Sequence, residues 1–493
     1  MPLFIVIIDE GQYHTDHSME LNRKSSTPLS VFGLIMINVI AIDSLRNIPT
    51  NAAAGLSIVS FYIIAGVFFL LPCILITSEL ATHYPKRGGV YIWVREAFGA
   101  RCGFVAIWLQ WIYNVVWYPS ILLFIATNIA YLINPEWIHY KIYMVPMVIG
   151  MFLSASLVNA FGMKISGVLS TISAIIGTML PMIILIALAV HWIAVGKPLA
   201  LPHPSWHDYL PHLQHHNHLA LLSIVLFSLM GIEMSAIHAA EVQQPEKGYP
   251  KALRISGAII LISLILATLA IALVVPQHTL NIVSGMDQAL SLLLNQNGLH
   301  WLLPLTIVMI IIGSFGGMAA WVIGPTKALM VAAEDGGLPR ILGRRNRHQA
   351  PTGMLVLQCI IVIALCSLFL FYQQINTVYW IFSDLTAILA LIFYILFFAA
   401  AIQLRYKTPA NKNAYRIPGK NHSGVWLAGT SGILTCSIVI VISFIPPANI
   451  PIGNIKIYEG ILIIGSLLMT LIPLPLYHWS QRQHQRTTSE SST

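Results

Sequence analysis

Residues 227–250, FSLMGIEMSAIHAAEVQQPEKGYP, contain the feature that decides the fold. The stretch begins as an apolar membrane helix and then places Gly231 and Glu233 a few residues into the hydrocarbon. An unpaired carboxylate at that depth costs roughly 2.5–3.5 kcal/mol on insertion scales. A glycine beside it lets the helix open, and open backbone is tolerated in a membrane only where protein or a water-filled cavity covers it. A broken helix with a charge at mid-membrane is typical of a transporter binding site.

The composition indicates an all-α polytopic membrane protein. The 493 residues are 57% hydrophobic and only 9% charged, with a mean hydropathy of +0.77, whereas soluble chains carry about 25% charged residues. We expect a transporter domain at 29–479 between short polar tails at 1–28 and 480–493, and the first apolar run is too short for a signal peptide. Twelve spans fit the pattern: 29–50, 56–79, 102–133, 142–161, 166–195, 219–241, 255–276, 301–332, 352–372, 376–402, 424–446 and 457–478.

The Lys and Arg residues predict the orientation of the chain. An even number of spans puts both termini on one side, and most of the 26 Lys and Arg residues fall on that side, against Lys141, Lys197 and Lys456 on the other. The positive-inside rule then predicts that both termini are cytoplasmic. The net charge of +8 is explained by this topology, so we expect the lipid bilayer and a small molecule as partners, and no nucleic acid. The sequence leaves the oligomeric state open.

Span 1, SVFGLIMINVIAIDSLRNIPT, is interrupted by polar residues in the same way as span 6. Its hinge is predicted at Ile40–Ala41–Ile42, just before Asp43. Asp43 lies twelve residues beyond Val31, near the start of span 1, and Glu233 lies twelve beyond Leu221, near the start of span 6, five spans later. Two interrupted helices at matching places indicate an inverted repeat with a site between its halves. The alternative is that Asp43 and Arg46 form an ordinary ion pair at a helix end.

Further polar and small residues lie inside predicted spans. Gln110 and Asn114 share one face of a helix and are expected to point inward, toward a site or a neighbouring helix. The glycines of GSFGG at 313–317 let another helix approach closely, and Trp321 lies beside them. Asp384 is either a helix-end acid or a site residue. The loop between spans 2 and 3 is expected to contain an amphipathic turn on the bilayer surface.

No enzyme signature, nucleotide-binding loop or metal-ligand spacing occurs in the chain. We therefore expect no enzymatic activity, no cofactor and no metal. The five cysteines have no redox or metal spacing and are expected to be buried, inert thiols. An external loop with six histidines gains charge in mildly acidic surroundings but has no tetrahedral zinc pattern, and we expect it to be solvated: His203, His207, His212, His215, His216 and His218.

These features resemble the amino acid–polyamine–organocation superfamily, and within it the glutamate/γ-aminobutyrate antiporter group. The resemblance covers nearly all of the chain from about residue 30 and is carried by four stretches: GIEMSAIHAAE…P…YP at 231–250, SELATHYPKRGGVYIWV at 78–94, AAWVIGP at 319–325 and SFIPPANI at 443–450. It implies a leucine-transporter-type fold of two inverted five-helix repeats, with helices 1 and 6 broken.

The resemblance also implies a set of substrate-binding positions. The break of helix 6 falls on Gly231, Ile232 and Glu233, and a cavity is lined by Trp321 and Tyr394. The break of helix 1 falls on residues 40–46, where backbone N–H groups bind a substrate carboxylate. The substrate-binding residues expected in this break are Ile40, Ala41, Asp43, Ser44 and Arg46.

The chain departs from the resembling proteins at three places, two of which concern substrate charge. Many superfamily members have a glycine-rich break in helix 1, whereas this chain has no glycine between Gly33 and Gly55. The resemblance places Arg46 where the antiporters have a tyrosine. It places Gly317 where they have a glutamate. An added arginine and a missing acid change the site charge, so the substrate need not be glutamate. The polar tail after span 12 is short, and we expect it to form no folded C-terminal plug.

The sequence thus predicts an amino acid transporter of a bacterial cytoplasmic membrane, an exchanger that works by alternating access. A proton-coupled symporter is one alternative. Between Lys164 and Lys197 the only candidate base in span 5 is His191, near its outer end, which favours exchange. A membrane sensor that binds an amino acid without moving it is a second alternative, which we do not expect because such sensors commonly add signalling segments and the two tails are short. Substrate identity, coupling and stoichiometry stay open.

Overall fold

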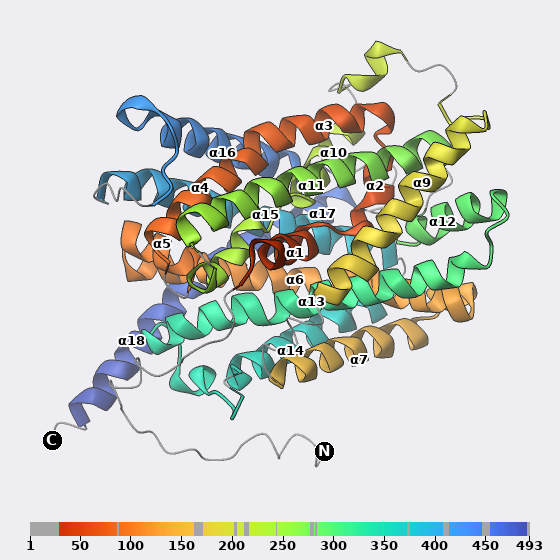
Figure 1. Cartoon of the computed structure of the whole chain (residues 1–493). Helices are drawn as coiled ribbons and strands as arrows, with labels where there is room; N and C mark the ends of the chain where they lie inside the picture. The colour runs from red at the N-terminus through yellow and green to blue at the C-terminus, as the bar shows by residue number, and fades with distance from the viewer. Residues whose placement is uncertain are drawn as a thin grey trace.

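The computed structural model describes residues 29–85, 88–161, 171–201, 205–211, 216–242, 244–276, 281, 283–348, 350–371, 375–407, 414–445 and 454–490. Within these residues the fold is a bundle of helices (Figure 1). The helices are α1 (Val31–Ile42), α2 (Ile48–Ala52), α3 (Ile58–Ala65), α4 (Leu71–His83), α5 (Val90–Phe98), α6 (Ala100–Ile133), α7 (Lys141–Ala160), α9 (Leu180–Ala194), α10 (His216–Phe227), α11 (Pro245–Val274), α12 (Gly285–Gln296), α13 (Leu302–Glu334), α14 (Thr352–Ser367), α15 (Ile375–Lys407), α16 (Ser423–Ile442), α17 (Ile455–Leu471) and α18 (Pro473–Glu490).

The twelve predicted spans are confirmed. In the described part of the chain twelve helical stretches are long and apolar enough to cross a membrane: Val31–Ala52, Gly55–His83, Ala100–Ile133, Lys141–Ala160, Ser173–Ala194, Leu221–Ala239, Pro245–Val274, Leu302–Glu334, Thr352–Leu370, Asn376–Lys407, Lys420–Ile442 and Ile455–Gln483. Span 7 begins ten residues earlier than predicted, because α11 starts with the polar turn PEKG before it becomes apolar. Pro245 suits that position, since the first turn of a helix does not need its N–H.

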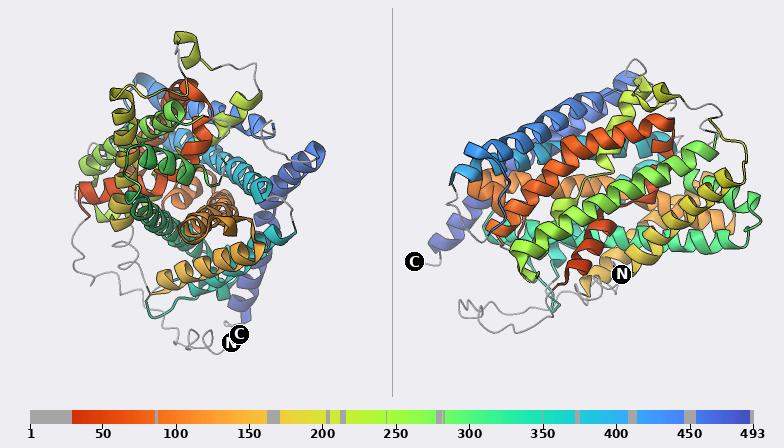
Figure 2. Two further views of the ribbon diagram at one scale, coloured as in Figure 1. Left: turned by 90° about the vertical axis from the view of Figure 1, so that its right-hand side faces the viewer. Right: turned by 45° about the horizontal axis from the view of Figure 1, so that its top comes forward.

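α6 lies near the middle of the bundle (Figure 2). It packs against α13, α15 and α5, and most of its length is buried. α15 packs against α6 and α16 and is likewise mostly enclosed. Spans 11 and 12 lie further out, where large apolar side chains such as Leu434 and Ile464 are exposed, as lipid contact requires. The helices in the centre therefore carry the polar residues that a transport site needs.

The amphipathic turn predicted on the bilayer surface is wrong in its location. α5 is a helix packed inside the protein against α6 and α15, and residues 90–94 are all buried. Tyr91 donates a hydrogen bond to Asp335 at 2.6 Å, and Arg95 pairs with the same carboxylate at 2.5 Å. Burial and the neighbouring Asp335 carboxylate raise the pKa of Tyr91. The apolar side chains that suggested membrane contact are used for packing within the bundle.

α12 was not predicted from the sequence. It follows span 7 and packs against α2, α9 and α13. Its Asp287 is fully buried, and neither carboxylate oxygen has a hydrogen-bond partner among the residues that the structure describes. Burial raises the pKa of Asp287 from 3.8 to about 8. The single acidic residue Asp287 did not indicate, in the sequence, that α12 is enclosed by protein.

The close helix approach predicted at the glycines of span 8 is confirmed. Gly313 of α13 lies against the backbone of Gly177, in the π-helical segment Ser173–Met179 that precedes α9. A Cβ on either glycine would overlap the backbone of the other. Gly317, one turn further along α13, would bring a Cβ to 3.3 Å from the carbonyl oxygen of Ile40. Small residues thus seat α13 directly beside spans 1 and 5.

Candidate functional site

The interruption of span 1 begins at Asp43. α1 ends at Ile42, Asp43 and Ser44 have extended backbone, and a 3-10 turn, η3 (Leu45–Asn47), leads into α2. The predicted hinge at Ile40–Ala41–Ile42 is therefore wrong, because these residues belong to the last turn of α1. Apolar residues gain nothing by leaving a helix, whereas Asp and Ser side chains compete for backbone hydrogen bonds and favour its end.

The interruption of span 6 is centred on Gly231. After α10 the backbone of Gly231 adopts φ +121°, and the chain continues as a 3-10 helix, η9 (Ile232–Glu241). A positive φ of this kind strongly favours glycine. The N–H of Gly231 donates to the Tyr394 hydroxyl at 2.8 Å, and that hydroxyl donates to Glu233 Oε2 at 2.6 Å. Tyr394, from α15, therefore bridges the open backbone and the buried acid.

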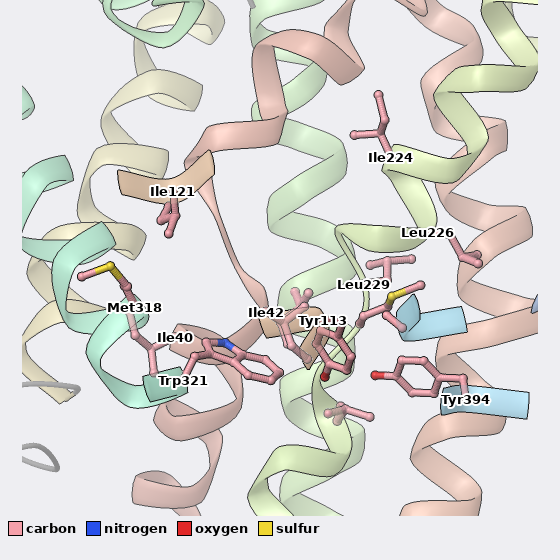
Figure 3. Close-up of a cluster of buried hydrophobic side chains, with 14 of the residues drawn as sticks. Ile40, Ile42, Tyr113, Ile121, Ile224, Leu226, Leu229, Met318, Trp321 and Tyr394 are labelled. Atoms are coloured by element: carbon pink, nitrogen blue, oxygen red, sulfur yellow. The ribbon is translucent and has the colours of Figure 1, made fainter. Parts of the chain in front are cut away.

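Trp321 links the two interruptions. Its indole Nε1–H donates to the carbonyl oxygen of Ala41 at 2.9 Å, at the end of α1. A Cβ at Gly231 would meet its ring at 2.8 Å. Figure 3 shows Trp321 beside Ile40, with Tyr113 and Tyr394 turned toward the same centre. The ring of Trp321 thus fills the space between the two broken helices.

We define the central cluster as Ala41, Gly231, Glu233, Trp321 and Tyr394 with the side chains that touch them. Two residues of α6, Gln110 and Tyr113, complete it. Gln110 donates to Glu233 Oε1 at 3.4 Å, and the Tyr113 ring lies 6.3 Å from that of Trp321. The inward orientation predicted for Gln110 is confirmed. Asn114 is also buried, although its amide donates to the backbone of Gln110 at 2.7 Å.

The aromatic residues of α6 were the part of this cluster that the sequence did not identify. Trp and Tyr are common at membrane interfaces, and the run WLQWIYNVVWYPS is compatible with such a belt. The signal that could have placed Tyr113 was its position three residues after Gln110, which puts both on one side of the helix.

The two charged residues at the first interruption, Asp43 and Arg46, are both buried. Asp43 is 3% exposed and accepts a hydrogen bond from the Ser263 hydroxyl at 2.9 Å, while its Oδ1 has no partner in the described part of the chain. Arg46 is 1% exposed. These two described residues form no ion pair with each other, so the alternative of a helix-end pair does not hold.

The structure therefore divides the predicted site residues into two groups. Ala41, Gly231, Glu233, Trp321 and Tyr394 are joined by hydrogen bonds or ring contact. Ile40 and Ile232 are buried beside them. Asp43 and Ser44 form the interruption of span 1 itself, and Arg46 lies in the 3-10 turn that follows it.

Asp384, which the sequence left as a helix-end acid or a site residue, is buried and accepts a hydrogen bond from the Tyr458 hydroxyl. It lines a pocket that also includes Arg46. The acid is thus enclosed by protein.

Metal and thiol chemistry gain no support within the described ranges. No group of three or more His, Cys, Asp or Glu side chains there could hold a metal ion. Four of the five cysteines are buried and Cys102 is half-buried. Of the histidine loop, His203, His212 and His215 lie outside the described residues, as do the side chains of His216 and His218.

Comparison with known proteins identifies related transporters. Residues 27–467 match the amino acid permease family. An uncharacterized transporter of Legionella pneumophila is 46% identical over 449 residues, which cover 91% of this chain and 96% of the relative. A glutamate/gamma-aminobutyrate antiporter of Lactococcus lactis is 29% identical over 480 residues, 95% of this chain and 93% of the antiporter. A probable agmatine/putrescine antiporter of the same species is 24% identical over 455 residues, covering 90% and 88%.

The matches and the fold agree. The twelve membrane helices with interrupted spans 1 and 6 have the arrangement that the resemblance implied. The relatives named above are transporters of bacterial membranes, two of them antiporters. Because the family match covers nearly the whole chain, this integral membrane transporter belongs to the amino acid permease family.

Proposed function

We propose that this chain exchanges amino acids across a bacterial cytoplasmic membrane by alternating access. The tails at 1–28 and 480–493 face the cytoplasm, and residues 29–479 form the transporter domain. The substrate binds between the interruptions of spans 1 and 6. Two antiporters among the relatives support exchange, and the distribution of Lys and Arg supports the orientation.

The observation that carries this proposal is the connection between the two interruptions. A single set of side chains reaches both: Trp321 bonds to the end of α1, and Tyr394 bonds to the opening of span 6. Transporters with inverted repeats bind substrates at such discontinuous helices, where backbone donors and acceptors are free of helical bonds. The N–H of Asp43 still donates to the carbonyl oxygen of Val39 at 2.7 Å, so the substrate carboxylate is received by backbone donors from Ser44 onward. Its ammonium is received by carbonyls near Gly231.

Glu233 and Trp321 have different roles in this proposal. Glu233 accepts hydrogen bonds from Tyr394 and Gln110, which suits an anchor that holds the broken helix in shape. Trp321 occupies the space between the two breaks and serves as the surface of a gate. Its movement away from Gly231 opens the site, and its return closes it.

The test is an exchange assay in proteoliposomes. Vesicles are preloaded in turn with glutamate, glutamine, γ-aminobutyrate, arginine or a neutral amino acid, and labelled substrate is added outside, with and without a pH gradient. Uptake only into loaded vesicles is expected. Uptake into empty vesicles driven by the pH gradient would establish a symporter instead, and binding without flux would establish a sensor. Protein-free vesicles give the background.

A further inference from the structure

A pocket separate from the central cluster lies where α4 and α15 end. α4 packs against α16 at this end of the bundle (Figure 1). The polar walls of the pocket are Glu79 and His83 of α4, Arg405 of α15, and Arg416 in the segment 414–417 that leads toward α16. We call it the Arg416 pocket. None of the residues that define the central cluster lines it, so the proposed exchange function does not account for it.

The charge of Glu79 is already matched within the protein. Its Oε1 accepts a hydrogen bond from Arg405 Nη1 at 2.5 Å, and its Oε2 accepts one from the backbone N–H of Ile417 at 2.7 Å. Arg405 Nη2 donates to the carbonyl oxygen of Ile417 at 2.9 Å. The side chains of Glu79 and Arg405 are both more than nine-tenths buried. This ion pair therefore attaches the segment 414–417 to the ends of two helices, and both carboxylate oxygens are occupied.

The donors of the Arg416 pocket exceed its acceptors. The Nε–H of Arg405 is buried and has no hydrogen-bond partner in the described part of the chain. A buried donor without a partner is destabilising, so this group points to an acceptor from outside the protein. Arg416 is exposed and forms no ion pair with a described residue. His83 Nδ1 lies 2.9 Å from the carbonyl oxygen of Glu79 and is its donor, so a protonated His83 offers Nε2 as a further donor.

The arrangement of these donors favours a phosphate group as the ligand. The donors come from α4, α15 and the segment 414–417, so they approach from several directions. A carboxylate has two oxygens in one plane, whereas the oxygens of a phosphate group are arranged tetrahedrally. Arginine is the side chain best suited to phosphate, because its planar fork pairs with two of these oxygens.

Aromatic residues beside the pocket place it at the level of lipid headgroups. Tyr406, which follows Arg405, and Trp426 of α16 are both exposed, and the indole N–H of Trp426 donates to the Tyr406 hydroxyl at 2.8 Å. Tyr and Trp are enriched where a membrane protein meets the membrane–water interface. Basic pockets between membrane helices on the cytoplasmic side bind the headgroups of anionic lipids.

We propose that the Arg416 pocket binds a phosphate group, and that its source is the headgroup of an anionic phospholipid. The exposed aromatic pair favours this source over free phosphate. That the lipid belongs to the cytoplasmic leaflet rests on the orientation proposed above, whereas the binding chemistry does not. A phosphate held by Arg405 and Arg416 connects α15 with the segment 414–417, so it stabilises the folded protein.

Short-chain lipids and simple anions test this chemistry in the purified, delipidated full-length protein. Melting temperatures are measured at one ionic strength with dihexanoyl-phosphatidylglycerol, dihexanoyl-phosphatidylcholine, inorganic phosphate and acetate. Phosphatidylcholine, whose ammonium cancels the phosphate charge, controls for the acyl chains. We expect phosphatidylglycerol to stabilise most and inorganic phosphate less, with no effect of phosphatidylcholine or acetate.

The other outcomes of this experiment are equally decisive. Stabilisation by inorganic phosphate that equals or exceeds that by phosphatidylglycerol would support the phosphate site and overturn the lipid as its source. Equal stabilisation by phosphatidylcholine and phosphatidylglycerol would overturn the proposal, because only the acyl chains would then be bound. Equal stabilisation by acetate and phosphate, or no stabilisation at all, would overturn it too.

Variants locate the effect at Arg416. Arg416→Gln should weaken binding of phosphatidylglycerol and phosphate roughly tenfold, because it removes charge-assisted hydrogen bonds. Arg416 is exposed, so the variant should fold. Arg416→Lys should retain part of the binding. Arg344→Gln, at an exposed arginine of another loop, is the matched control and should bind like the parent chain. Unaltered binding in Arg416→Gln would overturn the proposal.

Retained lipid gives a second measurement that does not depend on melting. Mass spectrometry of the intact protein in detergent, after expression in a bacterium whose membrane contains phosphatidylglycerol, reports the lipid that stays bound. The parent chain and Arg344→Gln should retain roughly threefold more of this lipid than Arg416→Gln. Equal retention in all of them would overturn the lipid as ligand. Neither measurement requires flux, so a chain that binds phosphatidylglycerol here but fails to exchange amino acids would refute the proposed function alone.

Discussion

The two interrupted spans differ in how their open backbone is held. In span 6 the opening at Gly231 is bonded to Tyr394, which is bonded to Glu233, and the ring of Trp321 covers it. In span 1 the Asp43 side chain accepts one hydrogen bond, from Ser263, and Trp321 bonds to the carbonyl oxygen of Ala41 just before it. Among the described residues Asp43 Oδ1 has no partner. The first is fixed by the protein itself, whereas the second has polar groups left over. We infer that span 6 provides the rigid wall of the site and span 1 the part that responds to a ligand.

The largest effect is expected from Gly231→Ala. A side chain at φ +121° is strained, and its Cβ would lie 2.8 Å from the Trp321 ring. Overpacking of this kind costs about 1–3 kcal/mol, in addition to the backbone strain. Exchange should fall by roughly a hundredfold, converted at tenfold for every 1.4 kcal/mol, and the protein should melt at a lower temperature.

Gly298→Ala is the control for that prediction. Gly298 also has a positive φ, +69°, but no atom lies within 4 Å of a Cβ placed there. It therefore reports the backbone strain without the contact. If both variants lose exchange equally, the ring contact at span 6 is not what holds the opening.

Tyr394→Phe should have the next largest effect. It removes the hydroxyl that bonds both Gly231 and Glu233, and hydrogen bonds to charged groups contribute about 1.5–3 kcal/mol. Exchange should decrease by roughly tenfold to a hundredfold, at normal membrane insertion. Tyr143→Phe, which removes a hydroxyl bonded to Ala126 at 3.0 Å, is the matched control. An equal loss in both variants would contradict a special role for Tyr394.

Asp43→Asn should separate transport from stability. The substitution removes a buried charge that is only partly bonded, and a neutral amide is less costly to bury. We expect the melting temperature to stay the same or rise, while exchange decreases by roughly tenfold if this carboxylate acts on the substrate. A fall in both the melting temperature and the exchange rate would mean that the interruption of span 1 is held by the protein in the same way as that of span 6. The contrast between the two interruptions would then disappear.

The smallest effect on transport is expected from Asp287, in the helix packed against α2 just after the first interruption. Burial raises its pKa to about 8, so between pH 4 and 8 the folded protein holds a proton that the unfolded chain releases. Stability should therefore decrease as the pH rises through this range, by up to about 1.4 kcal/mol per pH unit. Melting curves from pH 5 to 8 would show it.

Asp287→Asn removes this titration. The variant should melt at a higher temperature than the parent chain near pH 7.5, and the two should converge toward pH 5. Exchange should change less than about twofold, because a neutral side chain already occupies this place below the pKa of about 8. Parallel melting curves for the two proteins would contradict the assignment.

The sequence was sufficient for the architecture and for much of the central cluster. Hydropathy located all twelve spans, and a polar residue inside an apolar span is a strong signal because the membrane makes it costly. That signal identified Glu233, Asp43 and Gln110. The position of the hinge was wrong by about three residues, since local propensity distinguishes Ile42 from Asp43 only weakly.

Long-range contacts were beyond the sequence. Nothing in the chain indicates that Trp321 bonds to Ala41, 280 residues away, or that Phe227 and Tyr379 enclose Arg46. Such contacts depend on how helices are rotated about their axes, and aromatic residues are frequent enough in membrane helices that their number carries little information. The burial of α5 was missed for a related reason, because an amphipathic helix can cover its apolar face with lipid or with protein.

The backbone contact between Gly177 and Gly313 has a consequence for how this transporter can change over evolution. Each glycine occupies the space that a side chain at the other would need, so a gain of even one methyl group at either position has no room. A compensating change at the partner is impossible too, because glycine has nothing left to remove. We therefore expect both glycines to stay unchanged while the surrounding apolar residues are replaced by others of similar size.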